Sequence, residues 1–340
     1  MFEFLFYQAR YPLNDVRDRR VDSSKEMSKT RFPRSLVDDQ KALRAAYASF
    51  LARLAIGGLI VFCLPPIHDR EHAGLLLSVF IIALPYEWCR SRCIAAAYTS
   101  SGLKTPKGWT LAVIAVVGLG YGLRAVAGLW LAGIGDPRAL LLMALGASFF
   151  GSMFVALGWA LESTRAIKEV LAVRKAHLMW FQDAVSRTTG RPPVTLAPDQ
   201  KVLTEWQSPI SPWCFPAVFA TAALAAFALY MLREFVPTRQ LAYVGLAVVS
   251  TAALSVVIPL KWSRPLVACI GLGSATALSR LSAPPGGSVV AALIMILPSL
   301  YTCVARNMCF DDIPKTIGKI VDAITMILYL PYKWFTEARW

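Results

Sequence analysis

One arginine inside a long apolar block is the residue of this sequence that most clearly needs a binding partner. Arg124 lies in GLGYGLRAVAGLW, residues 118–130, three positions after Tyr121. An arginine at the centre of a membrane span costs about 2.5–3.5 kcal/mol to insert, so such residues are normally paired or face a wet cavity. The acidic residues nearly all lie between the apolar blocks. We therefore expect Arg124 to bind backbone carbonyls, a hydroxyl, water, a lipid phosphate or an anion.

The sequence leaves two interpretations of Arg124 open. In the first, the long side chain snorkels toward the headgroups on the outer side of the membrane. In the second, Arg124 and Tyr121 form a binding site for an anion or a lipid headgroup.

Small residues close to Arg124 predict a tight pair of helices. Gly118 and Gly122 are four residues apart and share a helix face, and Gly151 lies in the next apolar block. Small residues on one face allow two membrane helices to approach closely. We expect these glycines to pack the two helices together, joined by the short loop GIGDPR.

The residue patterns of common enzymes are missing. The sequence contains no GxSxG, no HExxH and no P-loop, and its seven cysteines include no CxxC pair. Proton-driven carriers place acids or histidines within their spans, and no histidine lies well inside one here. The loop HDREH, residues 68–72, could hold a metal only if it were helical. The sequence therefore predicts no catalytic residue, no metal site and no cofactor.

Composition sets the fold class. The chain has 340 residues, of which 56% are hydrophobic and 16% charged, and its mean hydropathy is +0.52. The apolar residues form blocks of about twenty, the length that a helix needs to cross a bilayer. We predict an all-α, polytopic membrane bundle of about eight helices. The expected spans are 48–65, 72–89, 109–133, 139–161, 213–232, 240–259, 265–279 and 287–305.

The positive charges predict the orientation. In alternating segments between the spans, twenty-eight Lys and Arg residues lie in one set and five in the other. Such a bias places the basic set in the cytoplasm, so both termini should be cytoplasmic, and we expect a bacterial inner membrane. The net charge of +14 then indicates anionic lipid and not nucleic acid as a partner.

The chain divides into five segments. They are a basic N-terminal segment (1–46), a first four-helix half (47–161), a cytoplasmic amphipathic helix with a Pro-rich loop (162–212), a second four-helix half (213–305) and an interfacial tail (306–340). This order leaves open whether the two halves arose by duplication.

Two amphipathic segments outside the spans predict surfaces for binding a partner protein or the membrane. In 163–188, Leu178 and Phe181 belong to an apolar face at helical spacing, and in the tail Ile317 and Ile324 belong to another. We expect each face to meet a partner protein or the membrane surface.

These features favour a non-catalytic subunit of a larger membrane assembly, for example a secretion, conjugation, defence or energy-transducing machine. Its expected partners are the lipid bilayer and other membrane-protein subunits. The alternative is a carrier or channel for a small or anionic solute, with Arg124 in the path. A lipid-modifying enzyme is the third hypothesis.

Overall fold

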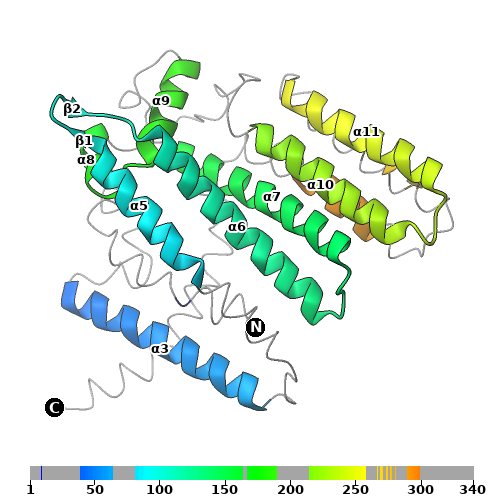
Figure 1. Cartoon of the computed structure of the whole chain (residues 1–340), viewed down its shortest axis with the longest axis horizontal. Coiled ribbons are helices and arrows are strands. Elements are labelled where there is room, and N and C mark those ends of the chain that lie inside the picture. The colour runs from blue at the N-terminus through cyan, green and yellow to red at the C-terminus, as the bar shows by residue number, and fades with distance from the viewer. Residues whose placement is uncertain are drawn as a thin grey trace. The chain divides into compact units, whose positions relative to one another are not determined.

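The computed structural model describes residues 39–63, 81–163, 167–189, 214–257 and 289–298, with position 9 and scattered positions between 266 and 280. Helix accounts for 86% of the residues described (Figure 1). The chain divides into two compact units, one made of Met1–Phe80 with Phe310–Trp340 and the other of Ile81–Cys309.

The described part of the first unit is one long helix. Helix α3, Asp39–Cys63, begins in the polar N-terminal segment and continues without a break into the first expected span, as far as residue 63. Ala42, Ala45, Ser49 and Arg53 are buried, and their spacing of three or four residues places them on one face.

The second unit is a row of helices packed in chain order (Figure 1). The row consists of α5 (Ala83–Ala97), α6 (Lys107–Leu131), α7 (Pro137–Ser163), α10 (Cys214–Leu232) and α11 (Thr238–Val257). Short connections reverse the chain between α6 and α7 and again between α10 and α11. The ends of the helices therefore gather at two opposite ends of the unit.

Three helices of this row are long and apolar enough to cross a membrane: Lys107–Leu131, Pro137–Ala160 and Phe215–Leu232. They coincide with the third, fourth and fifth expected spans. The helical class and embedding in a membrane are therefore supported. Residues 72–80 of the second expected span, most of the seventh, and residues 287–288 and 299–305 of the eighth lie outside the described residues. The described part of the eighth is the short apolar helix Val289–Pro298. The count of eight stays a prediction.

Helix α5 ends later than the charge pattern suggested. The expected span stopped at residue 89, but the helix continues to Ala97 and carries Arg90 and Arg92. It ends at a small antiparallel hairpin of β1 (Tyr98–Thr99) and β2 (Gly102–Leu103). Basic residues mark the depth of the membrane and are good helix formers, so they do not terminate a helix.

The amphipathic segment after α7 is two helices instead of one. Helix α8 covers Lys168–Arg174 and α9 covers Leu178–Thr189, with a break at residues 175–177. Helix α9 packs on α7 and α6, and α8 packs on α5 and β2. Both short helices therefore lie at the end of the unit where α5 ends and α6 begins (Figure 1).

Helices α7 and α10 join the two expected halves directly. Phe149 of α7 stacks on Phe219 of α10 with ring centroids 5.3 Å apart. A Cβ on Gly146 would lie 2.6 Å from Leu224 Cδ2. The absence of a side chain at Gly146 therefore leaves room for the Leu224 side chain. Beyond α10, a shared core includes Ala228 of α10, Val248 of α11 and Met295 of the 289–298 helix. Both halves therefore contribute to one packed unit.

Candidate anion site and the polar networks around it

Arg124 and Tyr121 lie side by side on α6. The guanidinium carbon of Arg124 is 4.2 Å from the centroid of the Tyr121 ring, which is a cation–π contact. The Arg124 Nε–H donates to the carbonyl of Gly120 at 3.1 Å. Both side chains are half-buried. A backbone carbonyl was among the partners expected for Arg124, and the Tyr121 ring adds a contact that was not.

The neighbouring helix fixes the Tyr121 ring. A Cβ on Gly151 of α7 would lie 2.6 Å from Tyr121 Cβ and closer still to the ring. The ring also lies 6.2 Å from the Phe154 ring, centroid to centroid. Tyr121 is therefore wedged against α7 and provides a fixed platform for the guanidinium. A guanidinium held in one orientation can offer paired N–H donors to a carboxylate or a phosphate.

The glycines beside this platform lie where α6 and α7 approach each other closely. A Cβ on Gly118 would lie 2.8 Å from the Ser148 carbonyl oxygen, and one on Gly122 would lie 2.8 Å from the Ala144 carbonyl oxygen. Side-chain oxygens of α7 would be closer still. The structure thus brings Gly118, Gly122 and Gly151 together at one interface, next to Tyr121 and Arg124.

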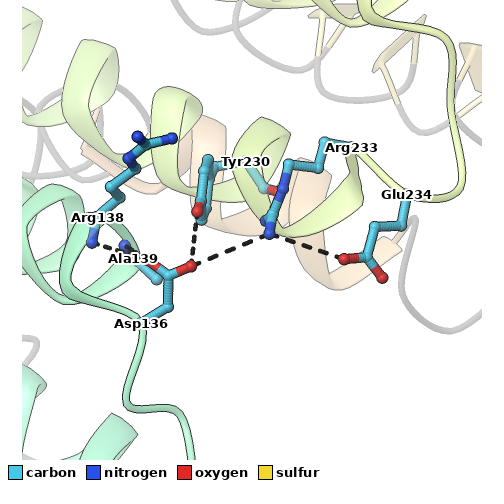
Figure 2. A network of polar contacts seen from close by, with 6 residues as sticks. All are labelled: Asp136, Arg138, Ala139, Tyr230, Arg233 and Glu234. Carbon is cyan, nitrogen blue, oxygen red and sulfur yellow. Dashed lines mark hydrogen bonds and ion pairs between the residues drawn. The ribbon is translucent and has the colours of Figure 1, made fainter.

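A polar network joins the start of α7 to the end of α10 (Figure 2). Asp136 precedes Pro137, the first residue of α7, and its Oδ1 accepts the backbone N–H of Arg138 at 2.8 Å and of Ala139 at 3.3 Å. Its Oδ2 accepts the Tyr230 hydroxyl at 2.6 Å. Asp136 is thus the N-cap of α7 and also ties this helix to α10.

Arg233 extends the network at its exposed side (Figure 2). Its Nη2 lies 4.0 Å from Asp136 Oδ2 and 3.7 Å from Glu234 Oε1. Its guanidinium carbon lies 3.8 Å from the Tyr230 ring centroid. In the sequence, Asp136 was only one of the acidic residues that lie between the apolar blocks. The pair Asp136–Pro137 was a readable signal for a helix start, whereas Tyr230 gave none.

The hydrogen bond from Tyr230 holds the pKa of the Asp136 carboxyl below its usual range. Partial burial opposes this shift, while the backbone N–H groups of Arg138 and Ala139 and the charge of Arg233 support it. A carboxyl with a lowered pKa stabilises the fold above its unfolded pKa. That contribution is lost as the pH falls through the folded pKa.

We therefore expect Asp136→Asn to remove a pH-dependent part of the stability. Asparagine caps a helix about as well as aspartate, so the variant keeps the cap and loses the charge. Wild type should unfold at a higher temperature than the variant at neutral pH, and the gap should close below about pH 4. Thermal unfolding of both proteins in one detergent over this pH range measures the effect. A gap that is independent of pH would contradict it.

The opposite end of the unit holds a second polar cluster. Asp183 of α9 accepts the Thr105 hydroxyl at 2.6 Å and pairs with Lys168 of α8 at 2.5 Å. Glu162 at the end of α7 pairs with Lys175 at 2.5 Å. These contacts fasten α8 and α9 to the ends of the membrane helices.

The apolar face of α9 packs inside the chain, which corrects the sequence prediction. Leu178 and Phe181 are fully buried. The Phe181 ring lies 5.9 Å from the Trp159 ring of α7 and 5.0 Å from the Trp180 ring, centroid to centroid. Neither side chain is available to a partner or a membrane surface, because α7 already covers this face. Ile317 and Ile324 lie outside the described residues.

The described residues contain no group of three or more His, Cys, Asp or Glu side chains that could hold a metal ion. The loop at 68–72 lies outside them.

Comparison with known proteins identifies no relative. No protein-family model, no curated protein and no solved structure matches this sequence.

Proposed function

We propose that the protein is a non-catalytic subunit of a larger membrane assembly. The observation that carries this proposal is that acidic side chains of the second unit make structural contacts between its elements. Asp136 caps α7 and binds Tyr230, Glu162 pairs with Lys175, and Asp183 pairs with Lys168. An enzyme or a proton-coupled carrier would need such groups to face a reactant. Here they hold helices together.

The same proposal places the chain in a bacterial inner membrane with eight spans and both termini in the cytoplasm. The distribution of charge over the unit supports this orientation. The end with α8 and α9 carries Lys104 and Lys107 besides its paired lysines. At the other end, the described basic residues are Arg138, Arg233 and Arg239, and Arg233 lies 4.0 Å from the carboxylate of Asp136. The more basic end is the one expected inside the cell.

Large exposed apolar side chains along the spans support partners within the membrane. Leu119 of α6, Leu141 of α7 and Phe215 of α10 are each more than half exposed. Such surfaces are covered by lipid tails or by other membrane helices. The bilayer, anionic lipid at the basic end and neighbouring subunits are the partners we propose.

A carrier or channel for a small or anionic solute is the second candidate. The observation in its favour is the guanidinium of Arg124, held 4.2 Å from the Tyr121 ring centroid. Gly118 and Gly122 bring α6 and α7 too close for a solute to pass between them at this level. A pathway that uses Arg124 would therefore run along another face of α6.

Purification of the tagged full chain at native expression level tests the proposal. In a mild detergent, we expect other membrane proteins to co-purify in fixed ratio, and Arg124→Ala to leave this set unchanged. A lone monomer would contradict the subunit role. A carrier predicts instead that Arg124→Ala abolishes solute flux while expression and folding survive, and that the exposed control Arg187→Ala keeps the flux.

A further inference from the structure

The exposed face of α5 changes polarity along the helix. Leu84, Trp88 and Arg92 follow one another at spacings of four residues, so they lie on one side of the helix. Leu84 is 69% exposed and Trp88 53% exposed, and Arg92 is exposed as well. A surface that passes from aliphatic to indole to cation matches the boundary between hydrocarbon and headgroups.

Helix α6 shows the same change at the same level. Its exposed side chains pass from Lys107 to Leu111 and Leu119, again at multiples of four residues. Trp109 lies at the start of this helix and meets Trp88 edge to face, with ring centroids 5.2 Å apart. Two neighbouring helices therefore mark one boundary independently.

Two cations stand on the polar side of this indole pair. The guanidinium carbon of Arg92 lies 5.7 Å from the Trp88 ring centroid, and Lys107 is two residues before Trp109. Lys168 and Lys175 at the same end pair with carboxylates. Among the described residues, no carboxylate forms an ion pair with Arg92 or Lys107. An anion from outside the chain can therefore reach both cations.

We propose that Trp88, Arg92, Lys107 and Trp109 bind the headgroup phosphate of an anionic phospholipid. The indoles sit at headgroup level, the stacked guanidinium offers its planar fork to the phosphate, and Lys107 adds a second positive charge. A lipid with a quaternary ammonium in its headgroup brings a cation to this pair and binds less well. The inference rests on the proposed embedding in the membrane, and the proposed orientation places the lipid in the cytoplasmic leaflet.

Native mass spectrometry of the full chain tests this site. The protein is released from detergent after equilibration with equal amounts of phosphatidylglycerol and phosphatidylcholine. We expect wild type to retain phosphatidylglycerol preferentially, and Arg92→Gln to retain about five-fold less, as expected for one cation near a lipid surface. The matched control is Arg187→Gln, an exposed arginine at the same end of the unit that has no cation–π contact with a described tryptophan. Trp88→Phe should weaken retention less than Arg92→Gln.

Three outcomes would overturn the inference. They are equal retention of the two lipids, equal losses in Arg92→Gln and Arg187→Gln, and capture of a polypeptide instead of lipid by a photo-crosslinker at position 91.

The proposed orientation in the membrane is tested separately, by cysteine labelling. In cells, Gly135→Cys should react with a membrane-impermeant maleimide from outside and Ser101→Cys should not, with wild type as the background. The reverse pattern would refute the orientation. It would move the lipid to the other leaflet without removing the site.

Discussion

Replacing Phe181 with alanine is expected to lower the free energy of unfolding by about 3–5 kcal/mol. Phe181 is fully buried between α9 and α7 and contacts the rings of Trp159 and Trp180. Truncation removes these edge-to-face contacts and leaves a cavity between α9 and α7. The break at residues 175–177 allows α9 to turn onto α7, so loss of this anchor should release α9 first.

Chemical unfolding in mixed micelles, followed by tryptophan fluorescence, measures the effect. Val173→Ala is the control, because Val173 lies on α8 and is 54% exposed, and its truncation should change the free energy of unfolding by less than about 0.5 kcal/mol. If Phe181 belonged to a partner surface, the variant would unfold like wild type and lose a co-purifying protein instead. Equal unfolding midpoints would therefore contradict the buried position.

Hydropathy predicted the class of this fold because a bilayer imposes a simple length rule. A span needs about twenty apolar residues. Residues 139–161 meet that need without a charged residue, and residues 109–133 meet it with Arg124 as their one charged residue. The structure has membrane-crossing helices in both places. The glycine spacing was also informative, since residues four apart on a helix share a face whatever else surrounds them.

Periodicity predicted which residues of α9 share a face but not what covers that face. An apolar stripe next to a membrane can meet lipid, a partner or the chain itself, and all three give the same pattern. Leu178 and Phe181 turned out to face α7. The break between α8 and α9 carries no glycine or proline, so no local signal announced it.

Long-range contacts explain the rest of what the sequence did not predict. Asp136 could be assigned as a helix cap from the following proline, but its bond to Tyr230 joins residues 94 positions apart. Arg124 could be identified from the sequence because it is a charged residue within an apolar block. The platform that orients it depends on Gly151 of another helix. Such pairings depend on which helices become neighbours, and one sequence alone does not encode that in a readable spacing.

Gly122→Ala should destabilise the helix pair α6–α7 by about 1–3 kcal/mol, the usual range for overpacking. The added Cβ would lie 2.8 Å from the Ala144 carbonyl oxygen and would also meet the Ser148 hydroxyl. The hydroxyl can rotate away, whereas the carbonyl belongs to the backbone of α7. The helices must therefore separate. Gly128→Ala is the control on the same helix, because no atom lies within 4 Å of its added Cβ.

One further variant separates the backbone clash from the side-chain clash, with the unfolding midpoint in mixed micelles as the measurement. Ser148→Ala in the Gly122→Ala background should restore only part of the stability, since the Ala144 carbonyl remains in place. Full recovery would show that the hydroxyl alone was responsible. Gly118→Ala meets the Ser148 carbonyl oxygen at 2.8 Å in the same way. One displacement of α7 relieves the clash at both glycine positions. The variant with both Gly118→Ala and Gly122→Ala should therefore lose less stability than the sum of the two single losses.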